Sequence, residues 1–99
     1  DAATMAPTAR LLADDGSGRV ALELSDPSRA YSVGRLQGAD LPVEAPAASR
    51  RHCELRHTTT GGAWAVTDLD SAQGTAVDGE RLAPGVPRLL SDGARVTVA

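Results

Sequence analysis

Apolar and polar residues alternate along most of this chain, and the alternation predicts short β-strands. Residues 18–25 place Val20, Leu22 and Leu24 on one face and small or polar residues on the other. That period of two is typical of a half-buried strand. No window of eleven or more residues has a helical period, and the nearest candidate, residues 6–13, is short and contains a proline. The segments that read as strands are 18–25, 30–34, 52–57, 63–68 and 95–99.

Glycine, proline and aspartate interrupt these segments at intervals of roughly 8–12 residues, which indicates an all-β sandwich or barrel. Residues 52–57 and 63–68 flank a Thr- and Gly-rich stretch and read as a hairpin. Asp78-Gly79 is the strongest short hairpin signal, because both residue types tolerate positive φ. Gly16-Ser17-Gly18 precedes a predicted strand, so we interpret it as a hairpin turn and not as a phosphate-binding loop. Residues 1–8 have no periodicity and are predicted to form a flexible tail before a single domain, 9–99.

Composition narrows the class of protein. The 99 residues include 13 acidic and 10 basic residues, for a net charge of −3, and all the basic residues are Arg. Lys, Asn, Ile and Phe are all absent. Their joint absence suggests the codon bias of a GC-rich bacterial genome and predicts a core of Leu, Val and Ala. The acidic balance disfavours a nucleic-acid module, although Arg50, Arg51 and Arg56 would be its contacts. No apolar run is long enough for a bilayer span and no secretion signal is present, so we expect a cytoplasmic domain.

The residues that most often carry catalysis or bind metals do not assemble into a site. Cys53 and His52 are neighbours and would point to opposite faces of a strand, so Cys53 is expected to be a core residue. His57 is five positions from His52, which also places the two on opposite faces. Asp68 and Asp70 are better explained as strand-end and turn residues. We therefore predict no enzyme, no metal and no cofactor.

One set of residues does follow the order of a known motif. Gly34-Arg35 ends a predicted strand, and Ser49-Arg50-Arg51-His52 follows fourteen residues after Arg35. The segment 68–75, Asp-Leu-Asp-Ser-Ala-Gln-Gly-Thr, then precedes Val77-Asp78-Gly79. In this order the pieces resemble the forkhead-associated (FHA) domain, which carries Gly-Arg, Ser-x-x-His, an Asn-Gly-Thr turn and a Val-x-Gly hairpin. The resemblance runs from about residue 10 to residue 99.

The resemblance implies an all-β sandwich of two antiparallel or mixed sheets, with about ten or eleven strands, whose end loops bind a phosphothreonine peptide. Arg35 and Ser49 would then hold the phosphate, and Arg50 would lie beside the peptide and the phosphate. The elementary chemistry agrees, since a phosphate with close to two negative charges suits a guanidinium fork and a hydroxyl donor. Structural support of the site is expected from Gly34, His52, Gly74 and Thr75. The partner would be a protein phosphorylated by an upstream Ser/Thr kinase.

The chain departs from the family pattern in the turn that faces the phosphate. Ala72 stands where members often have a hydroxyl, and Gln73 stands where the family has Asn. Both positions belong to the predicted peptide-binding set. Because a lost charge-assisted hydrogen bond costs about 1.5–3 kcal/mol, we hypothesise weaker binding or a different peptide preference. The same departure favours the alternative function, a degenerate FHA-fold scaffold that binds proteins without phosphate.

A second departure concerns the end of the fold. Residues 89–99 resemble the family's penultimate strand, and no counterpart of the last strand, which lies beside the first, follows them. Unpaired backbone groups in that place would be costly if they were buried. Either the sequence is a piece of a longer chain that carries this strand, or another segment fills its place, for example a neighbouring chain that forms a dimer by strand addition.

Overall fold

The computed structural model describes residues 9–12, 20–43, 48–58, 63–91 and 93–98. These residues form ten strands and no helix, so the described ranges hold no helix that crosses a bilayer. The predicted tail 1–8 and turn 16–18 lie outside the described residues. The strands are β1 (Ala9–Leu12), β2 (Val20–Leu24), β3 (Tyr31–Gly34), β4 (Leu41–Pro42), β5 (Cys53–Thr58), β6 (Ala63–Asp68), β7 (Thr75–Val77), β8 (Glu80–Arg81), β9 (Arg88–Leu89) and β10 (Val96–Val98).

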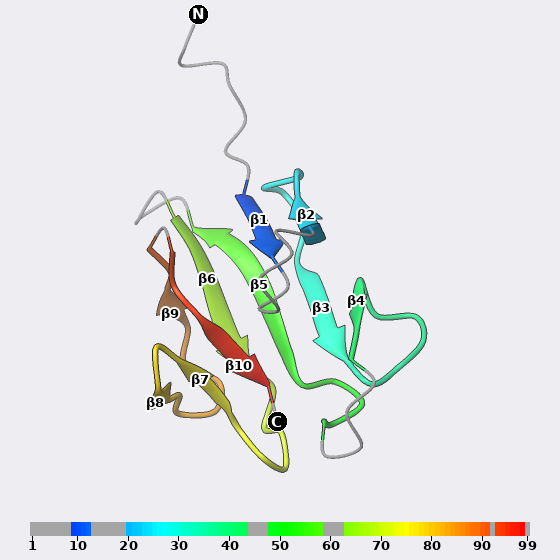
Figure 1. The fold of residues 1–99 in the computed structure, drawn as a ribbon, viewed down its shortest axis with the longest axis vertical. Coiled ribbons are helices and arrows are strands. Elements are labelled where there is room, and N and C mark those ends of the chain that lie inside the picture. Colours follow the sequence, from blue (N-terminus) through cyan, green and yellow to red (C-terminus); the bar gives the residue numbers. More distant parts are fainter. Residues whose placement is uncertain (1–8, 13–19, 44–47, 59–62, 92, 99) are drawn as a thin grey trace, which may run out of the picture.

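One layer of the fold is a five-stranded sheet in the order β4-β3-β5-β6-β9 (Figure 1). β3 and β4 are parallel and the other neighbours are antiparallel, so the sheet is mixed. β5 and β6 pair from Cys53 with Asp68 to Thr58 with Ala63, which confirms the hairpin predicted from residues 52–57 and 63–68. β5 alternates between buried and less buried residues from Cys53 to Arg56, whereas β6 buries three residues in a row from Trp64 to Val66.

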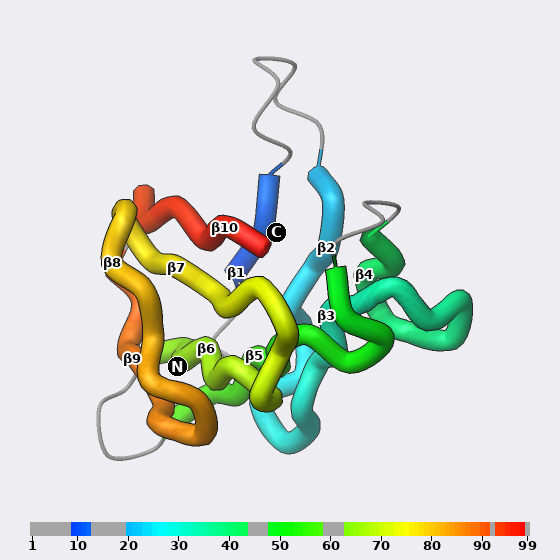
Figure 2. The backbone as a smooth tube through the Cα atoms, turned by 90° about the horizontal axis from the view of Figure 1, so that it is seen from below, coloured from blue at the N-terminus to red at the C-terminus, as the bar shows by residue number. Residues whose placement is uncertain are grey.

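The second layer lies on one side of this sheet and consists of two pieces, β1-β2 and β10-β7-β8 (Figure 2). The β7–β8 hairpin turns at Asp78 and Gly79, with φ of 51° and 84°, as predicted for this pair. β1 was not predicted, because its residues Ala-Arg-Leu-Leu do not alternate between apolar and polar. Residues 89–99 are also not one strand. Leu89 ends β9 in the first layer, and the chain passes Gly93, at φ 83°, before β10 begins in the second.

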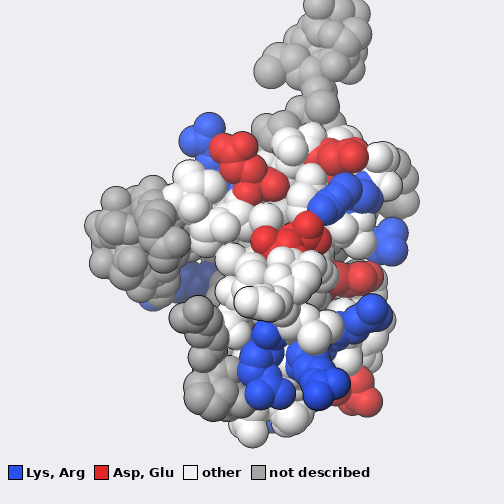
Figure 3. Space-filling view, turned by 90° about the vertical axis from the view of Figure 1, so that its right-hand side faces the viewer, with Lys and Arg blue, Asp and Glu red and all other residues white. Residues whose placement is uncertain are grey.

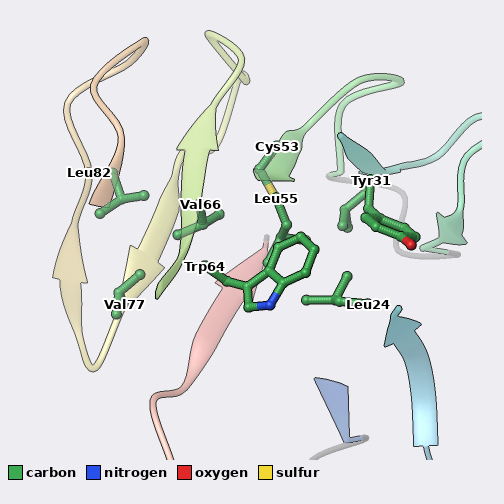
Figure 4. Close-up of a cluster of buried hydrophobic side chains, with 9 residues drawn as sticks. Leu24, Tyr31, Cys53, Leu55, Trp64, Val66, Val77 and Leu82 are labelled. Carbon is green, nitrogen blue, oxygen red and sulfur yellow. The ribbon is translucent and has the colours of Figure 1, made fainter. Parts of the chain in front are cut away.

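The core lies between the two layers (Figure 4). Leu and Val supply most of it, as the composition predicts, but Tyr31 and Trp64 also belong to it and meet edge to face at 5.9 Å between ring centres. The Tyr31 hydroxyl accepts hydrogen bonds from the backbone N–H groups of residues 25 and 26. Cys53 is fully buried, as expected, and burial raises the pKa of its thiol to about 12.

The two pieces of the second layer leave sheet edges open. Among the described residues, β1 pairs only with β2 and β10 pairs only with β7. The edges consist of backbone donors and acceptors that a further strand would satisfy.

Candidate functional site

Three loops meet at one end of the sandwich, where β3 and β6 end and β5 and β7 begin (Figure 1). They are the β3–β4 loop, the segment before β5 and the β6–β7 turn. The Arg35 N–H donates to the Ser49 carbonyl at 3.0 Å, and the Leu36 N–H donates to the Arg50 carbonyl at 3.3 Å. These bonds bring together Arg35, Ser49 and Arg50, the three residues expected to contact a phosphate.

Gly34 allows this close approach of two backbones. A Cβ atom placed on Gly34 would lie 2.0 Å from the Arg50 carbonyl oxygen and 3.1 Å from the His52 nitrogen. Real Cβ atoms do not come that near a backbone oxygen, so any larger residue would force the strands apart. In the pair Gly34-Arg35, the glycine therefore lets the segment before β5 pack closely, and the arginine is the first residue of the β3–β4 loop.

His52 joins the segment before β5 to the β6–β7 turn. It is fully buried, and its Nε2 lies 2.7 Å from the Gly74 carbonyl oxygen while its Nδ1 lies 3.1 Å from the Ser49 nitrogen. A carbonyl only accepts and a backbone N–H only donates, so these contacts fit the tautomer that carries its proton on Nε2 and accepts at Nδ1. The backbone N–H of His52 donates to the Val33 carbonyl. The prediction that His52 supports the loops is consistent with these contacts.

The β6–β7 turn is built around the buried carboxylate of Asp68. It accepts hydrogen bonds from the Ser71 hydroxyl and N–H and from the Thr75 hydroxyl. Burial disfavours the charged carboxylate, but these hydrogen bonds outweigh burial and lower the pKa of Asp68 below its usual value. The Ser71 hydroxyl accepts from the Gly74 N–H, and Gly74 has the positive φ of 85°. Asp68 is thus the central anchor of the turn, a role that its strand-end position only partly indicated.

Ser49 and Ala72 meet across the site. The Ala72 N–H donates to the Ser49 Oγ at 2.9 Å, which leaves the Ser49 hydroxyl hydrogen free to point elsewhere. The side chain of Ala72 has no donor, as its identity requires, and both Ala72 and Gln73 are exposed. The turn therefore reaches Ser49 through the backbone N–H of residue 72.

Asp40 holds the base of the β3–β4 loop. Its carboxylate accepts from the N–H and the hydroxyl of Ser32 and pairs with Arg29, whose guanidinium lies 3.9 Å over the Tyr31 ring. The Ser32 hydroxyl also accepts from the Asp40 N–H. These hydrogen bonds, led by the one from the Ser32 N–H, lower the pKa of Asp40. Hydrogen bonds therefore hold both ends of this loop, through Arg35 at its start and Asp40 near its end.

Eight of the ten arginines fall into two groups. Four of them pair with a carboxylate on the strand surfaces or loop flanks: Arg10 with Glu23, Arg29 with Asp40, Arg56 with Glu54 and Arg88 with Glu80. Four others make no ion pair in the described part of the chain: Arg35, Arg50, Arg51 and Arg81. Three of these four belong to the loop end, and basic side chains are visible at the lower end of one face in Figure 3. Positive charge without a partner is therefore concentrated where the three loops meet.

Arg81, on β8, borders this end, and the sequence did not indicate it. A Cβ on Gly74 would lie 2.6 Å from Arg81 Nε, so the guanidinium lies against the β6–β7 turn. The position of Arg81 could not be predicted from the sequence, because its contact with Gly74 depends on how β8 pairs with β7. The described ranges contain no group of three His, Cys, Asp or Glu side chains arranged to hold a metal ion.

Comparisons with known proteins agree with this geometry. The model of the FHA domain family matches residues 31–99. An FHA domain studied for phosphothreonine-dependent interactions is 30% identical, with a TM-score of 0.76, over 93% of this chain and 88% of that one. The FhaA FHA domain, solved with the intracellular domain of another protein, is 31% identical, with a TM-score of 0.68, over 92% of this chain and 89% of that one.

A third similar structure is Mycobacterium tuberculosis EmbR in complex with a low-affinity phosphopeptide. It is 30% identical, with a TM-score of 0.70, over 87% of this chain and 21% of the EmbR chain, so this chain spans about a fifth of that protein. No curated protein sequence matches significantly. The family match covers more than half of the residues, and the two-layered fold and the loop contacts agree with it, so the chain belongs to the FHA domain family.

Proposed function

We propose that this domain binds phosphothreonine-containing peptides and so recruits phosphorylated proteins, and that it is a binding module and not an enzyme. The observation that carries the proposal is that the backbone brings Arg35 and Arg50, neither paired with a carboxylate, next to Ser49. The similar FHA domain with phosphothreonine-dependent interactions and the EmbR phosphopeptide complex support it.

The chemistry of the three groups suits a phosphate. A phosphothreonine has close to two negative charges and three acceptor oxygens. Arg35 would supply a planar fork of donors, Ser49 a hydroxyl donor and Arg50 a second positive charge beside the peptide. Because Ser49 Oγ already accepts from the Ala72 N–H, its hydrogen is available to an anion. Gln73 and Ala72 would face the peptide from the opposite turn, and Gly34, His52, Gly74 and Thr75 would hold the loops.

The proposal is tested with a fluorescent peptide library that has a fixed phosphothreonine and random flanks, measured by anisotropy. Unphosphorylated and phosphoserine libraries serve as controls. We expect Arg35→Ala to weaken phosphothreonine binding by about 10- to 100-fold, because one charge-assisted interaction is worth about 1.5–3 kcal/mol. The matched control is Arg56→Ala, which removes an exposed arginine already paired with Glu54. Binding that ignores the phosphate, or that survives Arg35→Ala, contradicts the proposal.

The alternative, a scaffold that binds proteins without phosphate, rests on Ala72 and Gln73. The side chain of Ala72 has no donor for a phosphate, and its N–H is already used by Ser49. Arg35→Ala separates the two functions, because it would abolish phosphopeptide binding and leave phosphate-independent binding intact. Where phosphopeptide binding holds, we expect it to be weaker than is usual for the family, and Ala72→Ser to strengthen it.

The proposed setting is a bacterial cytoplasm in which a Ser/Thr kinase acts upstream. Purified partners would bind only after treatment with the kinase, and phosphatase would reverse the binding. Neither nucleic acid nor membrane insertion is part of this function, and no metal or cofactor is required by it.

We also propose that the open edges of β1 and β10 accept an added strand, for instance from a second copy of the chain. Each edge presents unpaired backbone donors and acceptors among the described residues, which is the chemistry of β-augmentation. Light scattering across a concentration series would then detect a dimer. A strict monomer with an intact sheet would oppose the idea.

A further inference from the structure

The side chain of Arg81 lies on the outer face of the second layer, at the rim of the loop end. Arg81 pairs with Ala76 across the β7–β8 hairpin. Thr75 and Val77 on either side of Ala76 are buried, so Ala76 and Arg81 face outward. Gly74 is two residues before Ala76 and shares that face, which is why the guanidinium covers it. No side chain at position 74 separates Arg81 from the turn.

The charge of Arg81 is not neutralised in the described part of the structure. The neighbouring carboxylate, Glu80, lies on the opposite face of β8 and pairs with Arg88 at 2.8 Å. Asp70, in the same turn as Gly74, makes no ion pair with Arg81 either. An exposed guanidinium that is packed along a turn but has no anion is available to a partner.

Arg81 is also close in space to the proposed phosphate site. It contacts Gly74, and two residues earlier the Ala72 N–H is held by Ser49 Oγ. An extended peptide advances about 3.3 Å per residue. A peptide with its phosphate at Ser49 that passes over the β6–β7 turn would therefore bring a side chain about two to four positions away to Arg81.

We propose that Arg81 is a specificity-determining residue that selects peptides with an acidic side chain near the phosphothreonine. The inference rests on the proposed phosphothreonine binding and adds the class of sequence that the site prefers. Arg81 acts beside the phosphate contacts and is not one of them. Its removal therefore changes which peptides are chosen and leaves the requirement for phosphate in place.

The test uses the full chain and a phosphothreonine library that is random at four positions on each side. Bound peptides are eluted and sequenced for the wild type, Arg81→Gln, Arg81→Glu and the control Arg56→Gln. We expect the wild type and Arg56→Gln to enrich Asp and Glu at one flanking position, Arg81→Gln to lose that enrichment, and Arg81→Glu to enrich Arg or Lys there. Individual peptides with and without the acidic residue should differ by about three- to tenfold for the wild type only.

The outcomes separate the inference from the function on which it rests. Phosphate-dependent binding without acidic enrichment, or with enrichment that survives Arg81→Gln, overturns the role of Arg81 and leaves the proposed function standing. A wild type that retains no phosphothreonine peptide overturns both. A loss of all phosphopeptide binding in Arg81→Gln, with an unchanged melting temperature, also overturns the inference, because Arg81 would then be a phosphate contact.

Discussion

Replacing Gly34 by alanine tests whether the close approach of β3 to the segment before β5 maintains the site. The new Cβ would lie 2.0 Å from the Arg50 carbonyl oxygen, whereas ordinary contacts begin at 3.4 Å. The backbone must therefore open by about 1.4 Å, the difference between these two distances. An opening of that size breaks the hydrogen bonds from Arg35 to Ser49 and from Leu36 to Arg50, which are 3.0 and 3.3 Å long.

The cost follows from these two bonds and from strain. Each bond contributes about 1 kcal/mol, and overpacking costs about 1–3 kcal/mol, which the opening relieves in part. We expect Gly34→Ala to lower the free energy of unfolding by about 2–4 kcal/mol, which is a fall in melting temperature of about 10 °C or more for a domain of this size. Phosphopeptide affinity should fall at least about tenfold, because Arg35 and Ser49 separate.

The assay is thermal unfolding followed by circular dichroism, with peptide anisotropy on the same samples. Gly38→Ala is the matched control in the same loop, since its Cβ would meet no atom within 4 Å and its backbone is not left-handed. That variant should unfold within about 1 kcal/mol of the parent. A Gly34→Ala protein that melts within about 2 °C of the parent and binds equally well would refute the reasoning.

Two further predictions concern buried ionisable groups. Because hydrogen bonds lower the pKa of folded Asp68 below the ordinary value of 3.8, its contribution to stability is complete above that value and is lost as the pH falls through the folded pKa. Urea unfolding at pH 7, 5 and 3 should therefore show that the free energy of unfolding falls with pH, and that it falls less for Asp68→Asn. At pH 7 the variant should be about 1–3 kcal/mol less stable than the parent. Parallel pH profiles of the two proteins would contradict this. The thiol of Cys53, with a pKa of about 12, should be inert to a thiol reagent at pH 8 and react only in denaturant, and fast labelling of the folded domain would argue against its burial.

The sequence predicted the parts of the fold in which a local rule decides the structure. Residues 53–56 alternate between apolar and charged side chains, and Asp78-Gly79 is suited to positive φ, so both are visible without any partner. β1 is different, because its register with β2, for example Leu11 with Leu22, is set by tertiary pairing. The strands β4, β8 and β9 have two residues each, too few to show a period.

The candidate site shows the same division. The order of Gly34-Arg35, Ser49 and His52 predicted the candidate residues, because their spacing resembles a family motif. The motif did not contain the contact of His52 with Gly74, which lies 22 residues away, or the position of Arg81 over that glycine. Those contacts arise from the pairing of β7 with β8 and from the path of the β6–β7 turn, which no single segment encodes.

The two hydrogen bonds of the His52 ring have a kinetic consequence. They hold the segment before β5 and the β6–β7 turn in one arrangement, and Gly34 and Asp40 hold the third loop, before a ligand arrives. We therefore expect association to need no loop closure, and its rate to be set by diffusion and by electrostatic attraction to the unpaired arginines. Peptides of equal charge should bind this domain at nearly equal rates and differ mainly in how long they stay bound.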